Sequence, residues 1–223
     1  MIYQFGRFLS WCVFKIFGRL TVIGREHIPR SGGCVLAANH TSYADPPLVG
    51  VAAFPRKIWF MAKSELFDVP VLGFFIRRTQ AFPVKRASAD RQALRRTHEL
   101  LTGGEAVTIF FEGGRSTDGR LQPPELGPAM IALRADVPIV PIAIVNADQL
   151  LPRSGGIRFT HLTVVCGEPL SFPHLAGKHA DREALREVSE AVARQVAVML
   201  RAHGAADRVP PGYLESSADC ATT

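Results

Sequence analysis

The chain has 223 residues, of which 47% are hydrophobic, and its formal net charge is +6. This length and apolar content suit one domain with a sizeable buried core. Its four cysteines are scattered without a C-x-x-C pair, which argues against a disulfide framework or a zinc site and indicates reduced thiols in a cytosolic setting. The basic balance favours anionic partners: a phospholipid surface, a phosphorylated substrate, a nucleotide-bearing cofactor or nucleic acid.

The N-terminal stretch MIYQFGRFLSWCVFKIFGRL is too interrupted to span a bilayer, which needs roughly 20 mostly apolar residues. It also lacks the small-residue cleavage site of a signal peptide. On a helical wheel a broad apolar face lies opposite Arg7, Lys15 and Arg19, with aromatic rings beside the polar residues. This pattern is typical of a helix in the membrane interface, but it also fits a helix packed on its own domain, and one helix can do both. We expect residues 1–23 to form a membrane-associating helical segment.

Beyond this segment, short apolar runs alternate with helical patterns, which predicts an α/β domain with a largely parallel, buried sheet flanked by helices. The expected strands are 35–38, 58–61, 81–84, 107–111, 139–144 and 162–165. The expected helices are 47–53, 71–76, 89–101 and 128–135, with a long final helix at about 181–203. We therefore expect a main domain at 24–204 and a flexible C-terminal tail at 205–223, where the residues become small and polar.

The first expected strand ends in an unusual polar stretch, NHTSYAD, from Asn39 to Asp45. In an open α/β sheet, ligands bind beyond the carboxyl ends of the strands, where His40 would lie. A short turn could fold the Asp45 carboxylate onto one imidazole nitrogen and leave the other free as a general base. Alternatively, Asp45 followed by Pro46 could cap a helix, and His40 could be structural. Since the chain has no G-x-S-x-G nucleophile elbow, a base here would activate a substrate hydroxyl.

A second polar loop follows the expected strand at 107–111 and reads EGGRS, from Glu112 to Ser116. Glycines permit close approach of the backbone to a ligand, and Arg115 can bind a phosphate through two parallel hydrogen bonds. The alternative is an ordinary surface turn. The two loops together favour a site for a phosphorylated substrate that carries a hydroxyl group.

Together with two further stretches, these loops resemble the ordered blocks of the glycerolipid acyltransferases, especially the 1-acylglycerol-3-phosphate (lysophosphatidic acid) acyltransferases. The stretch from Asn39 to Asp45 fits the first signature, N-H-x-S-x-x-D, without exception. GFFIRR at 73–78 resembles the second block, FFEGGRS at 110–116 the third, and VPIVPIAI at 137–144 the fourth. Four blocks in the right order make a chance match improbable.

The resemblance implies an enzyme that moves a fatty acyl group from a thioester donor to the free hydroxyl of a lysophospholipid, most simply 1-acylglycerol-3-phosphate. His40 would be the base, and Asp45 would orient it. The residues expected to bind the glycerol phosphate are Arg77, Glu112, Gly113, Gly114, Arg115 and Ser116. The residues expected to support the site structurally are Asn39, Ser42 and Pro141. Acyl-CoA or acyl carrier protein would be the co-substrate, with no cofactor and no metal.

Two positions depart from the third block, which usually reads F-P-E-G-T-R-S: Phe111 replaces the proline and Gly114 the threonine. They flank the expected phosphate loop and so concern the acceptor head group more than the reaction. An acyltransferase for a different lysolipid or an amino-alcohol lipid is therefore the closer alternative. A nucleic-acid-binding module would explain the charge but not the His/Asp pair, and no such motif is present, so no nucleic-acid partner is expected. We expect a peripheral or monotopic protein on the cytoplasmic face of the cell membrane.

Overall fold

The computed structural model describes residues 2–85 and 90–213. In this part of the chain, seven strands form one sheet in the order β1-β7-β6-β2-β5-β3-β4. All neighbouring strands are parallel except β6 and β7. The strands are β1 (Thr21–Ile23), β2 (Cys34–Ala38), β3 (Ile58–Lys63), β4 (Ala81–Val84), β5 (Ala106–Phe110), β6 (Ile139–Val145) and β7 (Thr163–Cys166). The predicted α/β fold with a largely parallel sheet is confirmed.

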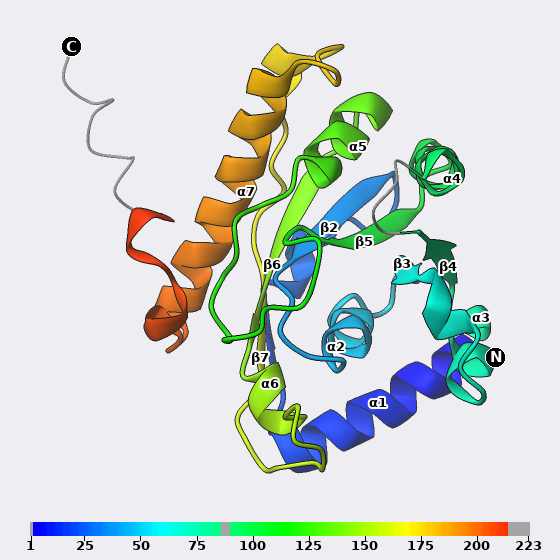
Figure 1. Ribbon diagram of the computed structural model, residues 1–223, viewed down its shortest axis with the longest axis vertical. Helices are drawn as coiled ribbons and strands as arrows, with labels where there is room; N and C mark the ends of the chain where they lie inside the picture. Colours follow the sequence, from blue (N-terminus) through cyan, green and yellow to red (C-terminus); the bar gives the residue numbers. More distant parts are fainter. Residues whose placement is uncertain (1, 86–89, 214–223) are drawn as a thin grey trace.

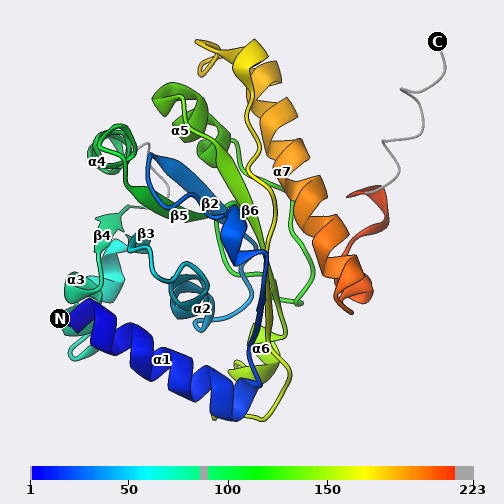
Figure 2. The same cartoon turned by 180° about the vertical axis from the view of Figure 1, so that it is seen from behind.

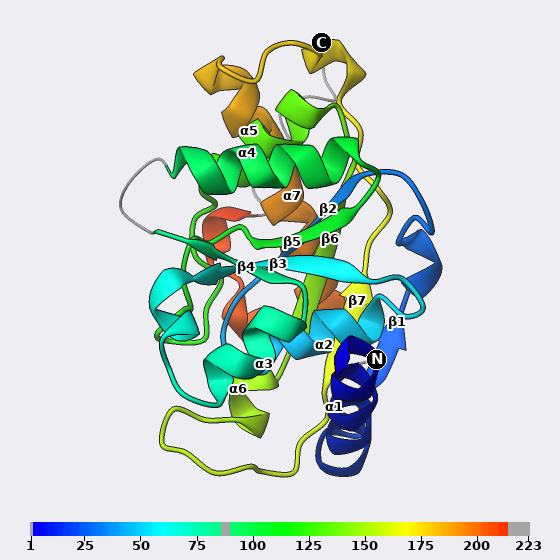
Figure 3. The ribbon, with the colours of Figure 1, turned by 90° about the vertical axis from the view of Figure 1, so that its right-hand side faces the viewer.

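Helices cover both faces of this sheet (Figures 1 and 2). The helices are α1 (Ile2–Gly18), α2 (Asp45–Ala52), α3 (Leu72–Arg78), α4 (Arg91–Thr102), α5 (Gly127–Ala135), α6 (Ala147–Leu150) and α7 (Arg182–Ala202). Figure 3 shows α4 and α5 on one side of the strands and α1 and α2 on the other. The long helix α7 lies on the same side as α4 and α5 and shares their apolar core.

The sheet separates two apolar cores. Val35 and Ala37 of β2 pack with α4, α5 and α7, whereas Leu36 and Ala38 pack with α1 and α2. All five residues of β2 are therefore buried, which explains why its sequence is a continuous apolar run rather than an alternating one. One face of the final helix α7 also lies in the core, where Val188, Val192 and Val196 are buried.

The strand register brings the two polar loops together. β2 lies between β5 and β6, with Ala38 opposite Phe110 of β5 and Ile142 of β6. Because the three strands are parallel and in register, the residues that follow β2 and β5 leave the same edge of the sheet side by side. This edge carries both candidate loops.

The N-terminal segment forms helix α1, which packs on the domain along one side. Phe14 and Gly18 are buried, and the Tyr3 hydroxyl accepts a hydrogen bond of 3.2 Å from the Ile58 N–H. Arg7 also turns toward the domain, where its guanidinium donates to the Arg56 carbonyl at 3.2 Å. The helical wheel put Arg7 opposite the apolar face, yet Arg7 contacts the domain, because a packed helix sorts its side chains by contacts rather than by polarity alone. Within the described residues, no helix is long and apolar enough to cross a membrane.

The C-terminal segment is ordered further than the sequence indicated. Residues 206–208 and 211–213 form 3₁₀ turns, and Val209 packs against the core beneath α7. Tyr213 donates a hydrogen bond of 2.6 Å to the Gln122 carbonyl. Residues 205–213 of the expected tail thus have regular turns and tertiary contacts, and residues 214–223 lie outside the described part. A sequence rich in proline and small residues can still be fixed by such tertiary contacts.

Candidate active site

His40 and Asp45 form a buried pair at the carboxyl end of β2. His40 Nδ1 lies 2.7 Å from Asp45 Oδ2, and the residues are 7% and 0% exposed. The imidazole stacks on the Phe110 ring of β5, with 3.9 Å between ring centroids and an interplanar angle of 17°. The carboxylate thus occupies one ring nitrogen, which leaves Nε2 for a substrate proton.

The Asp45 side chain organises the turn that carries this pair. Its Oδ2 atom also accepts the backbone N–H groups of Thr41 and Ser42, each at 2.7 Å. Helix α2 begins at Asp45 itself, its N-cap residue is Ala44, and no side chain caps it. The alternative of Asp45 as a helix N-cap is therefore wrong, because the carboxylate points back to the turn and the imidazole instead of into the helix.

Glu112 is a buried brace between the two loops. One carboxylate oxygen accepts the His40 N–H at 2.6 Å, and the other accepts the Gln122 N–H at 2.9 Å. In return, the His40 carbonyl accepts the Ser116 N–H at 2.8 Å. The structure thus places Glu112, which is 8% exposed, against backbone groups of the protein. This geometry supports a positioning role better than the expected contact with substrate.

The environment of Glu112 also changes its acidity. Burial raises the pKa of the Glu112 carboxyl to about 7, and the negative charges of Asp45 and Asp118 act in the same direction. The two backbone N–H donors from His40 and Gln122 lower the pKa and only partly offset this effect. The Glu112 carboxyl therefore titrates close to neutral pH, at a pKa of about 7.

A cavity of about 660 Å³ opens beside this pair. Thr41, Ser42 and Tyr43 line it from the β2 loop, and Arg115 and Ser116 line it from the β5 loop. The Arg115 guanidinium stacks over the Tyr43 ring at 3.6 Å from the ring centroid, an arrangement that holds the charge at the cavity wall. The structure thus brings His40, Asp45, Ser42, Arg115 and Ser116 into one region.

The remaining predicted residues have more varied positions. Asn39 is buried and bridges to β6, where its side chain accepts from the Ile144 N–H at 2.8 Å and donates to the Ile144 carbonyl at 3.1 Å. Gly113 has a left-handed φ of +69°, and an added Cβ would lie 2.9 Å from Glu125. Gly114 follows it in the same loop, and Pro141 lies within β6 rather than at its end.

Arg77 is not among the residues that line this cavity. It lies on α3, where its guanidinium donates to the Phe67 carbonyl at 2.8 Å and stacks on the Phe67 ring. The side chain is exposed and engaged by its own local structure. The expected contact of Arg77 with the glycerol phosphate stays a prediction.

Comparisons with known proteins identify the family of this chain. The model of the family described as Acyltransferase matches residues 19–145. The chain belongs to this acyltransferase family. A 1-acyl-sn-glycerol-3-phosphate acyltransferase of Bacillus subtilis (strain 168) is 30% identical over 200 residues, which cover 87% of this chain and 95% of the relative. The match to the family model includes both loops of the site.

Two further relatives are informative. The crystal structure of the 1-acyl-sn-glycerophosphate acyltransferase PlsC from Thermotoga maritima superimposes with a TM-score of 0.70 at 28% identity, and the match covers 90% of this chain and 78% of that one. A lyso-ornithine lipid O-acyltransferase of Brucella abortus (strain 2308) is 31% identical over 183 residues, or 76% of this chain and 65% of the relative. Similar chains thus carry names with different acceptors.

The structure also brings residues to the site that the sequence patterns did not indicate. Arg153 lies in the connection between α6 and β7, where its Nη2 donates to the Ser116 carbonyl at 2.8 Å, and it lines the same cavity. Thr41 occupies a variable position of the first signature, yet this residue lines the cavity too. Arg153 follows β6 in the sequence, and β6 ends at the same edge of the sheet as β2 and β5. Its position after this third parallel strand was the one feature of the sequence that could have indicated it. Within the described residues, no group of three or more His, Cys, Asp or Glu side chains is arranged to bind a metal ion.

Proposed function

We propose that this acyltransferase transfers a fatty acyl group from a thioester to the free hydroxyl of 1-acylglycerol-3-phosphate, giving phosphatidic acid. The observation that carries the proposal is the 2.7 Å contact between His40 Nδ1 and Asp45 Oδ2 beside a cavity walled by Arg115. The names of the Bacillus and Thermotoga relatives support this choice of acceptor.

In the proposed reaction, His40 Nε2 removes the proton from the acceptor hydroxyl as its oxygen attacks the thioester carbonyl carbon. The buried Asp45 carboxylate stabilises the resulting imidazolium. As the tetrahedral intermediate collapses, the C–S bond breaks, and the imidazolium returns its proton to the departing thiolate. The products are an ester and a free thiol, and no acyl-enzyme forms. Base catalysis of this kind contributes typically about 10²–10⁴-fold to the rate.

The donor in this proposal is acyl-CoA or acyl carrier protein, which acts as a co-substrate, and the enzyme needs no resident cofactor. Direct attack by the acceptor makes a protein nucleophile unnecessary. This agrees with the absence of a G-x-S-x-G elbow from the sequence. Both donors present the same thioester to His40, so the mechanism is the same for each.

An acceptor of a different class is the second candidate. The similarity to a lyso-ornithine lipid O-acyltransferase favours it, because that relative's name carries a head group without glycerol phosphate. A panel of lysolipids with matched acyl chains, assayed with both donors by thiol release, separates the two. The highest kcat/KM for 1-acylglycerol-3-phosphate supports the first candidate, and a higher value for a phosphate-free lysolipid supports the second.

We further propose that the enzyme works on the cytoplasmic face of the cell membrane, as a peripheral or monotopic protein. Both its acceptor and its product would be membrane lipids in this proposal. Exposed apolar side chains on α1 support it, since they offer a surface that a bilayer interface would cover. The chemistry needs no nucleic-acid partner.

The first test replaces the proposed base. His40→Ala removes the general base of the proposed mechanism, so we expect kcat to fall at least about a hundredfold. Circular dichroism and thermal unfolding check that the variant folds. Thiol release from the folded variant at close to the wild-type rate would contradict the mechanism.

A further inference from the structure

The acceptor-side cavity has a second guanidinium besides that of Arg115. Arg153 lines the same cavity and donates from Nη2 to the Ser116 carbonyl at 2.8 Å. This bond anchors Arg153 to Ser116, the residue that follows Arg115 in the loop after β5. A guanidinium has five N–H donors, so one bond to a carbonyl leaves most of them for a ligand.

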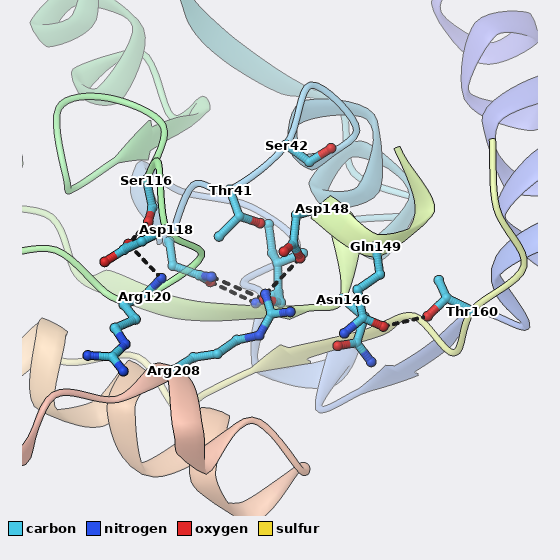
Figure 4. Close-up of polar contacts among 12 residues, drawn as sticks. Thr41, Ser42, Ser116, Asp118, Arg120, Asn146, Asp148, Gln149, Thr160 and Arg208 are labelled. Carbon is cyan, nitrogen blue, oxygen red and sulfur yellow. Dashed lines mark hydrogen bonds and ion pairs between the residues drawn. The ribbon is translucent and has the colours of Figure 1, made fainter. Parts of the chain in front are cut away.

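The carboxylates at this cavity already have partners (Figure 4). Asp118 Oδ1 accepts from the Ser116 hydroxyl at 2.9 Å and from the Arg120 N–H at 3.0 Å. Asp148 Oδ1 is paired with the Arg208 guanidinium at 2.7 Å. In contrast, neither guanidinium of the Arg115 and Arg153 pair forms an ion pair within the described residues. The wall between the two loops therefore carries two guanidinium groups that are available to an anion.

A buried hydroxyl at the same cavity also lacks a partner. Thr41 is 7% exposed, and its Oγ1 atom has no hydrogen-bond partner among the described residues. Figure 4 shows Thr41 beside Ser116 at this site. An unpaired buried hydroxyl lowers stability unless something binds it, so this atom points independently to a ligand with an acceptor oxygen.

We propose that Arg153 joins Arg115 in binding the phosphate of the acceptor, with the Thr41 hydroxyl as a further donor, and that Arg153 sets the preference for phosphate over phosphate-free head groups. A phosphate monoester carries about −1.5 to −2 charges near pH 7, more than one guanidinium neutralises. Each of the two planar guanidinium groups can present two N–H groups to the oxygens of the phosphate. This inference rests on the proposed function, because it assigns the acceptor's head group to this cavity.

The test compares Arg153→Gln and Arg153→Lys with Arg158→Gln as the control. Arg158 lies in the same connection, is exposed, and does not line the cavity. Glycerol 3-phosphate and glycerol serve as soluble probes in calorimetry, and 1-acylglycerol-3-phosphate and monoacylglycerol serve as acceptors. For Arg153→Gln we expect glycerol 3-phosphate affinity to fall, and the KM for 1-acylglycerol-3-phosphate to rise, by about tenfold or more. Arg153→Lys should show a smaller change, and Arg158→Gln none.

A bracing role alone would act differently, because loss of the bond to the Ser116 carbonyl would impair both acceptors equally. Equal loss on both acceptors, unchanged affinity in Arg153→Gln, or no binding of glycerol 3-phosphate by the wild type would each overturn the proposal. Failure of the proposed function is seen separately, as a wild-type protein that releases no thiol with any lysolipid. Calorimetry reads the phosphate site without turnover, so the two failures are distinguishable.

Discussion

At the scale of single residues, one carboxylate oxygen organises the turn that holds the proposed base. Asp45 Oδ2 accepts from two backbone N–H groups and contacts His40 Nδ1, all at 2.7 Å. An asparagine oxygen could keep some of these bonds, but it carries no charge to stabilise an imidazolium. Asp45→Asn should therefore lower kcat roughly a hundredfold or more while changing stability much less.

Asp136→Asn is the matched control for this change, since Asp136 is exposed and follows α5, far along the chain from the site. Thiol-release kinetics measure kcat, and urea unfolding measures stability for both variants. If Asp45→Asn kept the kcat of the control, the orienting role of Asp45 would be wrong.

Glu112 gives a prediction on stability against pH. Burial raises the pKa of its carboxyl to about 7 from the ordinary value of 4.5. The folded protein therefore holds this proton more tightly than the unfolded chain does. The contribution favours folding fully below about pH 4.5 and is lost as the pH rises through about 7. A shift of this size corresponds to about 3 kcal/mol in the free energy of unfolding.

Glu112→Gln removes this titration. We expect the wild type to lose stability relative to the variant by about 3 kcal/mol between about pH 4.5 and about pH 8. Urea unfolding at several pH values measures the difference, and Glu190→Gln, at an exposed position on α7, serves as the control. Parallel curves for wild type and Glu112→Gln would show that the carboxyl titrates normally in the folded protein.

The two departures from the third block have different structural consequences. Phe111 is 2% exposed and packs in the core on the α7 side of the sheet, so it does not line the cavity beside the two loops. Gly114 is part of the loop between Glu112 and Arg115 and stays a position that bears on the acceptor. The sequence could not separate these effects, because side-chain direction depends on the strand register.

At the scale of elements, most strands and helices could be predicted from the sequence, whereas β1 and α6 could not. The strand expected at 81–84 matches β4, and the final helix expected at about 181–203 matches α7 within a residue or so. β1 and α6 have three and four residues, too few to show a period. Their positions depend on pairing with β7 and on packing in the core, which arise only in the folded chain.

The site was predictable to a similar extent. Strand ends and signatures indicated His40, Asp45 and Arg115, because parallel strands bring their carboxyl ends together. The contact of Arg153 with Ser116 joins residues 37 positions apart and has no local pattern. The direction of the Glu112 side chain, toward backbone N–H groups, was likewise hidden from sequence reasoning.

The C-terminal segment is connected to the candidate active site by hydrogen bonds. Tyr213 donates to the Gln122 carbonyl, and the Gln122 N–H donates to Glu112, which in turn accepts from the His40 N–H. Burial raises the pKa of Tyr213 to about 12, so its hydroxyl keeps the proton that it donates. A continuous series of hydrogen bonds thus runs from the end of the described chain to the proposed base.

At the scale of the whole molecule, exposed apolar side chains gather on α1 and α3. They are Ile2, Phe5, Phe8, Leu9, Trp11 and Ile16 on α1 and Phe74 and Phe75 on α3. The two helices are neighbours, since the start of α1 lies beside α3 (Figure 1) and an added Cβ at Gly6 would lie 4.0 Å from Thr79. Soluble proteins rarely expose large apolar patches, so this surface fits a lipid interface.

Because Arg7 faces the domain, the basic side chains left on α1 and just after it for anionic lipid are the exposed Lys15 and Arg19. Each basic residue near an anionic surface contributes about 1 kcal/mol, and salt screens the attraction. Vesicle binding should therefore weaken as the salt concentration rises. The apolar face must supply the remaining affinity.

Replacing Leu9 and Ile16 together with Glu should release the enzyme from phospholipid vesicles. Both side chains are more than half exposed, at 54% and 64%, so the change removes lipid contacts without opening the core. Sedimentation with vesicles measures binding. Thiol release with a short-chain, water-soluble acceptor should stay near the wild-type rate, because His40 lies at the edge of the sheet and not on α1. Val198→Glu, at an exposed apolar position on α7 across the sheet, is the control and should still bind. Sedimentation of the Leu9 and Ile16 variant with vesicles at the wild-type level would exclude α1 as the membrane contact.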